Sequence, residues 1–197
     1  RARGEFDETL LIVCGDHGEG FGEFGLLSGQ PRAAAHIVPT TESLLHVPLV
    51  VKHPHQREVR LVTDLAALTA VRDVVDAAIE GSRATCARRR VLASKQPVTG
   101  DLRDRYEAAV DDPEPFLRES RVVYEPADRG VRKTFSWGET VGSVDVPRPG
   151  TVGPVTAGDR EHLSTAFESI EHAAVRQVGG GDPTDETREQ LAALGYF

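Results

Sequence analysis

The chain has little of several residue types, and each shortage excludes a class of protein. Only two cysteines, Cys14 and Cys86, occur among its 197 residues, too few for the disulfide framework of a small secreted domain. No apolar run approaches the roughly 18 residues that a membrane-spanning helix needs, and no signal-peptide pattern opens the chain. We therefore expect no membrane partner and a cytoplasmic location. Cys14 lies within an apolar run, which predicts a small buried core residue.

Lysine and methionine are scarce as well. Lysine occurs only at Lys52, Lys95 and Lys133, and the formal net charge is −8. Because binding to a nucleic-acid backbone needs a basic face, we expect no nucleic-acid partner. Acidic excess with few lysines fits a halophilic protein and equally fits ordinary mild acidity.

There is no methionine, and Arg1 stands only a few residues before an apolar run, so we expect further sequence upstream.

Residues 10–19 carry the strongest chemical signal. The apolar run Leu10–Cys14 has the length of one buried strand, and Gly15 with the adjacent Asp16 and His17 follows it. In open α/β sheets, ligands bind at the C-terminal edge of the strands. Asp and His both coordinate divalent cations, so Asp16 and His17 are candidate metal ligands. The alternative is a turn aspartate beside an ordinary surface histidine.

A glycine-rich loop is expected from residue 15 to about residue 35, and loops of this length are usually functional or disordered. Its segment Gly20–Gly25 has the dinucleotide-binding spacing Gly-x-Gly-x-x-Gly, but the preceding carboxylates of Asp16 and Glu19 would repel a pyrophosphate. His36 is the candidate catalytic residue, because an imidazole after the candidate metal site could protonate a leaving group.

The run Arg88–Arg90 is either an anion-binding group or a solvated charged face.

The periodicity of the remaining chain predicts an α/β fold in two parts. Spacings of three and four residues predict an amphipathic helix over 59–79. Closely spaced strands predict a small antiparallel sheet, and charged or amphipathic stretches predict further helices. The strands are expected at 46–51, 91–93, 121–124, 131–135 and 141–146, and the helices at 103–110, 163–178 and 184–194. Residues 1–90 are then the end of a mixed or parallel-sheet core with the metal-ligand loop, and residues 91–197 a smaller α+β subdomain.

Three segments, taken in order, resemble the sulfatase family of the alkaline phosphatase superfamily. They are Asp7–Glu19 with its Asp-His-Gly-Glu, Gly22–Gly25, and Leu44–Val51 with its Val-Pro-Leu. Val62–Leu65 and Leu191–Tyr196 look like further family landmarks, whereas residues 90 to 180 match little. The resemblance implies that residues 1–90 belong to an alkaline-phosphatase-like core.

The same resemblance implies hydrolysis of a sulfate ester, on a small molecule or a glycan, at a divalent metal that is commonly Ca²⁺. Asp16 and His17 match the family's downstream pair of metal ligands. His36 approximately matches a histidine that contacts the sulfate or protonates the leaving oxygen. The metal would polarise the nucleophile and the sulfuryl oxygens as a Lewis acid.

The chain also departs from the family pattern. It has no Cys/Ser-x-Pro-x-Arg nucleophile motif and no place for the upstream acidic metal ligands. Phe24 replaces a histidine, and Gln30 stands where many members carry an anion-binding Lys or His. We therefore expect a C-terminal portion that is inactive alone and needs the upstream half of the protein. Two alternatives stay open: a phosphodiester or phosphonate monoester hydrolase using Mn²⁺ or Zn²⁺, and a non-catalytic remnant with a structural or interaction role.

Overall fold

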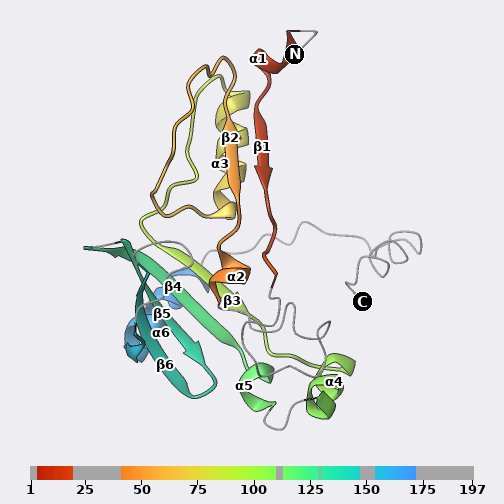
Figure 1. Cartoon of the computed structure of the whole chain (residues 1–197), viewed down its shortest axis with the longest axis vertical. Coiled ribbons are helices and arrows are strands. Elements are labelled where there is room, and N and C mark those ends of the chain that lie inside the picture. The colour runs from red at the N-terminus through yellow and green to blue at the C-terminus, as the bar shows by residue number, and fades with distance from the viewer. Residues whose placement is uncertain (1–3, 20–40, 110–112, 129, 147–153, 172–197) are drawn as a thin grey trace. The chain divides into compact units, whose positions relative to one another are not determined.

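The computed structural model describes residues 4–19, 41–109, 113–128, 130–146 and 154–171. Helices and antiparallel strands mix in these ranges, so the fold is α/β in the loose sense that both kinds of element contribute (Figure 1). The chain divides into a compact unit of residues 1–166 and a second unit of residues 167–197. His36, the loop 20–35 and the helix expected at 184–194 lie outside the described residues.

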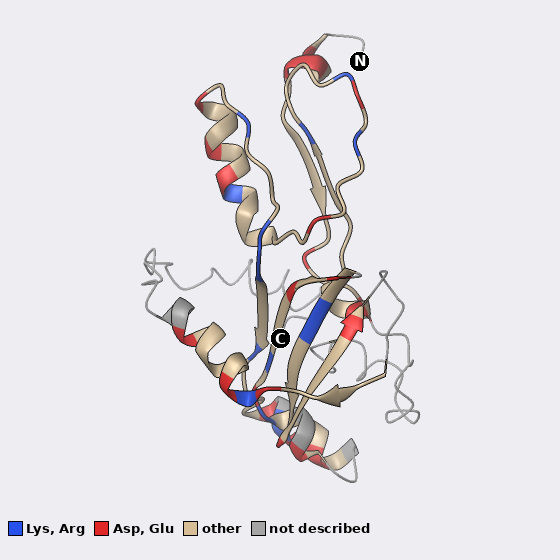
Figure 2. Ribbon diagram, turned by 90° about the vertical axis from the view of Figure 1, so that its left-hand side faces the viewer, with Lys and Arg blue, Asp and Glu red and all other residues tan. Residues whose placement is uncertain are grey.

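The first two apolar strands form a two-stranded antiparallel sheet. β1 (Leu11–Cys14) pairs with β2 (Leu49–Lys52). The acidic turn α1 (Glu5–Glu8), red in Figure 2, precedes β1. Lys52 Nζ donates to the carbonyl oxygens of Asp7 at 3.1 Å and Thr9 at 2.9 Å. Because carbonyl groups at a helix C-terminus have no intrahelical donor, Lys52 satisfies them and anchors the turn beside β2.

One face of this sheet packs on a helix. The 3₁₀ turn η1 (Leu68–Ala70) leads into α3 (Val71–Ile79), and Ala70, Val74 and Cys86 form a buried cluster. Four side chains of the sheet region pack against that cluster: Ile12 of β1, Leu49 and Val51 of β2, and Leu10 just before β1. Successive strand residues point to opposite faces. Leu11, Val13 and Val50 therefore lie on the other face, where they are 39%, 53% and 55% exposed.

Only the C-terminal half of the helix expected over 59–79 is present, and the prediction of helix for the N-terminal half is wrong. Val59 and Leu61 are exposed, and helical structure begins only at Leu68. Residues 65–67 instead pair with residues 86–88. Ala67 N donates to the Cys86 carbonyl oxygen at 3.1 Å, and Arg88 N donates to that of Leu65 at 2.7 Å. This pairing uses backbone groups that a helix would need, so the tertiary contact overrides the periodicity.

Cys14, which was expected to be buried, is exposed, whereas Cys86 is buried. Cys14 is exposed, although it lies within β1. Cys86 is 6% exposed and belongs to the cluster under the sheet. Burial raises the pKa of the Cys86 thiol, which keeps it protonated as a small apolar residue. The prediction of a buried Cys14 was wrong: β1 ends at that residue, and Cys14 is exposed although strand alternation places it on the same face as Ile12.

A five-stranded antiparallel sheet occupies the second half of the first unit. Its order is β3 (Val91–Lys95), β4 (Ser120–Ala127), β5 (Gly130–Trp137), β6 (Thr140–Val146) and β7 (Thr156–Ala157). The helices α4 (Asp101–Ala109) and α5 (Glu114–Leu117) lie between β3 and β4 in sequence, and α6 (Arg160–Glu171) follows β7. The antiparallel sheet expected from strands at 121–124, 131–135 and 141–146 is confirmed, and each strand is longer than predicted.

The two faces of this sheet contact different helices. Tyr124 and Glu125 are neighbours on β4, so their side chains point to opposite faces. Tyr124 Oη donates to Glu42 in α2 (Glu42–Leu45) at 2.8 Å. Glu125 Oε2 lies 2.7 Å from Nε2 of His162 in α6. The sheet is therefore held between α2 on one face and the start of α6 on the other.

Every strand pair in the described residues is antiparallel. The alkaline-phosphatase-like core and the boundary at residue 90 stay predictions. Among the helices that the structure describes, none is both long and apolar enough to cross a bilayer.

Candidate functional site

The Asp16–His17 pair lies in the loop that leaves β1, and two backbone hydrogen bonds fix this loop. Gly15 N donates to the Pro48 carbonyl oxygen at 3.1 Å, and Gly18 N donates to the Leu44 carbonyl oxygen at 2.8 Å. Residues 15–18 consequently lie alongside residues 44–48, the segment that leads from the end of α2 into β2. Two of the motifs that carry the family resemblance, Asp-His-Gly and Val-Pro-Leu, are thus neighbours in the fold.

Gly18 is required by close packing against α2. A Cβ atom at this position would lie 1.8 Å from the Ser43 carbonyl oxygen and 2.8 Å from the Ser43 carbonyl carbon. Such distances are impossible between non-bonded atoms, so any side chain would push the loop off α2. At Gly15 the nearest atoms to a Cβ would be 3.4 Å away, which is an ordinary contact.

Hydrogen bonds within the loop set the orientation of the two candidate ligands. His17 N donates to Asp16 Oδ1 at 2.9 Å, and His17 Nδ1 lies 2.7 Å from the Gly18 carbonyl oxygen. A carbonyl oxygen can only accept, so Nδ1 carries the proton in this hydrogen bond. In the neutral ring Nε2 is then the nitrogen without a proton, and it lies 3.9 Å from Asp16 Oδ2. A metal-binding histidine commonly donates its other ring N–H to a carbonyl in this way.

This donor pair fits a divalent cation. Two ligand atoms at about 2.0–2.2 Å from one tetrahedral ion lie about 3.3–3.6 Å apart, so the 3.9 Å between Asp16 Oδ2 and His17 Nε2 has to shorten by a few tenths of an ångström on binding. The side chains of His17 and Asp16 are 44% and 75% exposed, so solvent ions reach them. Among the described residues, no group of three or more His, Cys, Asp or Glu that could hold a metal ion is found.

The other candidate residues fall into two groups. His36, Gly20–Gly25, Phe24 and Gln30 lie outside the described residues, so their roles stay predictions. In the run Arg88–Arg90, by contrast, both ends bind carboxylates of this chain. Arg88 pairs with Asp73, and Arg90 Nε donates to Glu125 Oε1 at 2.7 Å. These ion pairs support a structural role for the run and not an anion-binding site.

A buried ion pair near the loop was missed by the sequence analysis. Lys133 Nζ donates to Glu42 Oε1 at 2.7 Å, and the two side chains are only 8% and 16% exposed. Tyr124 Oη donates to the same oxygen at 2.8 Å. Burial, then the charge and hydrogen bond of Glu42, raise the pKa of Tyr124, so the phenol stays a proton donor. Strand alternation was the available signal, since it places Lys133 on one face with Val131 and Phe135.

Comparisons with known proteins identify no relative of this chain. No family model, no curated protein and no solved structure matches it. The functional interpretation therefore depends on the geometry of the loop and on the resemblance of its motifs.

Proposed function

We propose that this chain carries part of the metal site of a sulfatase-like hydrolase, with Asp16 and His17 as two ligands of a divalent cation. The observation that carries the proposal is the fixed 3.9 Å approach of Asp16 Oδ2 and His17 Nε2 in a loop pinned to residues 44–48. A bound cation would supply Lewis-acid polarisation of the sulfuryl oxygens. The chain itself holds the cation and fixes the imidazole tautomer through the Gly18 carbonyl oxygen.

The proposal includes an upstream half of the same protein, which supplies the nucleophile and the remaining ligands of an alkaline-phosphatase-like core. Exposed apolar side chains support it. Among the described residues, and with the exception of Val155, the large exposed apolar side chains lie between residues 6 and 79: Phe6, Leu11, Val13, Val50, Val59, Leu61, Val62 and Ile79. Exposed apolar patches mark surfaces that pack against other protein. The open face of the β1–β2 sheet is where further core elements would pack.

The substrate class and the acid are part of the same proposal. The substrate is a sulfate ester of a small molecule or a glycan, and His36 protonates its leaving oxygen. The isolated chain hydrolyses no sulfate ester, because it contains no Cys/Ser-x-Pro-x-Arg nucleophile. We place the protein in the cytoplasm.

One observation favours a second candidate, a phosphodiester or phosphonate monoester hydrolase on the same scaffold. Ca²⁺ prefers oxygen ligands, whereas an imidazole nitrogen suits Mn²⁺ and Zn²⁺. The hydrogen bond from His17 Nδ1 to Gly18 presents such a nitrogen. A clear preference of the site for Zn²⁺ or Mn²⁺ over Ca²⁺ would favour this candidate.

Calorimetric titration of the chain with Ca²⁺, Mn²⁺ and Zn²⁺ tests the ligand assignment. We expect binding that Asp16→Ala abolishes and that Asp104→Ala, a change at an exposed aspartate in α4, leaves intact. Equal binding by both variants, or no binding by the folded wild type, would contradict the metal site and favour the non-catalytic remnant. Addition of the upstream half should then give metal-dependent hydrolysis, and parallel assays on a sulfate ester and a phosphodiester decide between the two candidates.

A further inference from the structure

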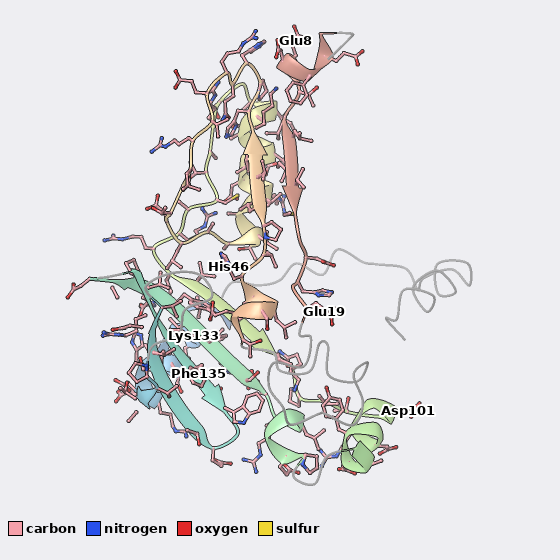
Figure 3. The ribbon with its side chains drawn as sticks, viewed as in Figure 1. Glu8, Glu19, His46, Asp101, Lys133 and Phe135 are labelled. Atoms are coloured by element: carbon pink, nitrogen blue, oxygen red, sulfur yellow. The ribbon has the colours of Figure 1, made fainter. Side chains whose placement is uncertain are left out.

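The buried pair of Glu42 and Lys133 joins two parts of the chain that are 91 residues apart in sequence. Lys133 lies on β5, the middle strand of its sheet, opposite Tyr124 of β4 and Val144 of β6 (Figure 3). Its ammonium group also lies over the rings of Tyr124 at 5.5 Å and Phe135 at 5.7 Å. A cation held by two neighbouring strands and two aromatic rings is a rigid anchor for the carboxylate that it contacts.

Glu42 belongs to an element that needs such an anchor. α2 has four residues, and the side chain of its N-cap residue Thr41 makes no capping hydrogen bond. A single helical turn is unstable by itself, so external contacts must hold it in place. Two side chains of α2 provide these contacts: Leu44 is 7% exposed, and Glu42 accepts hydrogen bonds from both Lys133 and Tyr124.

The same turn supports the Asp16–His17 loop. The Leu44 carbonyl oxygen accepts the hydrogen bond from Gly18 N, and Gly18 packs so closely on Ser43 that no Cβ atom fits. A shift of α2 therefore moves Gly18, whose carbonyl oxygen orients the His17 ring. The contacts run without a gap from Lys133 through Glu42 and the α2 backbone to the two candidate ligands.

We propose that Glu42 and Lys133 are positioning residues for the Asp16–His17 ligand pair, so that the five-stranded sheet sets the geometry of the metal site through α2. This inference rests on the proposed function for its metal, but its structural half is independent of any metal. Breaking a buried ion pair by removing one partner leaves an uncompensated charge. The loss of either charge therefore displaces α2 first, and the loop with it.

The test uses Lys133→Met, which removes the charge and keeps the length of the side chain, and Lys133→Arg, which retains the charge. Arg132→Met is the matched control, because Arg132 is the preceding residue on β5 and points to the opposite face of the sheet, where its side chain and that of its ion-pair partner Asp145 are 59% and 56% exposed. Amide hydrogen exchange at Gly18 without metal reports on the support of the loop. Mn²⁺ affinity, followed by electron paramagnetic resonance, reports on the ligand pair.

In Lys133→Met we expect exchange at Gly18 to accelerate at least about tenfold, with β4 and β5 amides still protected, and Mn²⁺ to bind about tenfold more weakly. In Lys133→Arg, the Gly18 exchange rate and the Mn²⁺ affinity should return most of the way to the wild-type values. Arg132→Met should change neither of them. If Lys133→Met does not fold, Glu42→Gln gives the same two readouts with less disturbance of the sheet. Unchanged Gly18 exchange in a folded variant, or equal effects in Arg132→Met, would overturn the inference. A wild type that binds no Mn²⁺ while Gly18 exchange responds as expected would refute the proposed function and leave the support of the loop established.

Discussion

At the scale of single residues, Gly18 makes the closest backbone approach in the candidate site. Because a Cβ atom there would lie 1.8 Å from the Ser43 carbonyl oxygen, we expect Gly18→Ala to break the hydrogen bond to Leu44. Overpacking of this kind destabilises a protein by about 1–3 kcal/mol. Urea unfolding measures the loss, and Gly15→Ala in the same loop is the control, since its Cβ atom has room. Equal stabilities of the two variants would show that the loop does not pack on α2.

Glu125 gives a prediction about pH. Burial raises the pKa of Glu125, but hydrogen bonds and charges from Arg90 and His162 outweigh burial, and the net pKa lies below the ordinary value of 4.5. A carboxylate with a lowered pKa stabilises the fold above its unfolded-state pKa, and this contribution is lost as the pH falls through the folded-state pKa. We expect wild type to exceed Glu125→Gln in stability by about 1 kcal/mol at pH 7, and the gap to close below pH 4.5.

Chemical denaturation of both proteins from pH 7 to pH 3 measures that gap. Glu58→Gln, a change at an exposed glutamate, serves as the control and should show little difference from wild type at any pH. A gap between wild type and Glu125→Gln that persists unchanged at pH 3 would contradict the role of the ionised carboxylate.

The candidate ligands Asp16 and His17 can be predicted from the sequence, whereas the buried pair of Glu42 and Lys133 cannot. Asp16 and His17 are adjacent and follow an apolar strand, so a local pattern suffices to single them out. Glu42 and Lys133 lie on separate elements, and only the pairing of β4 with β5 and the placement of α2 bring them together. No local spacing encodes that contact, although a lysine on the apolar face of a strand indicates that some buried partner exists.

At the scale of elements, α3 shows where periodicity predicts a helix and where it fails. The spacing of apolar residues is the same before and after residue 68, but only Val71–Ile79 has a buried face to fill. Before residue 68 the chain finds backbone partners at residues 86–88 instead. Periodicity reports which residues could share a face, and tertiary pairing decides whether the helix forms.

Val74 is the centre of the contact between α3 and the β1–β2 sheet. It is fully buried, with Leu10, Ile12, Leu49 and Val51 packed against its cluster. We expect Val74→Ala to destabilise the protein by about 2 kcal/mol, because it removes buried methyl groups and leaves a cavity. Ile79→Ala on the same helix, at a position that is 79% exposed, should cost under about 0.5 kcal/mol. Thermal unfolding compares them, and similar losses at both positions would contradict the packing of α3 on the sheet.

At the scale of the whole molecule, the strands that are close in sequence were the predictable part. β4, β5 and β6 follow one another with short turns, so their antiparallel pairing follows from their spacing. The pairing of β1 with β2 spans residues 15–48 and depends on a long connection that no spacing rule constrains. The open apolar face of that sheet, with Val13 and Val50, also depends on what packs there, which strand alternation alone does not specify.

The central claim, that Asp16 and His17 hold a divalent cation, is tested most directly by nuclear magnetic resonance of the ¹⁵N-labelled chain during titration with Mn²⁺. The paramagnetic ion broadens the amide signals nearest to it. We predict selective broadening at residues 15–18 and at the adjoining residues 44–48, and its loss in Asp16→Ala with the rest of the spectrum preserved. Broadening centred elsewhere, or the same broadening in Asp16→Ala, would contradict the claim.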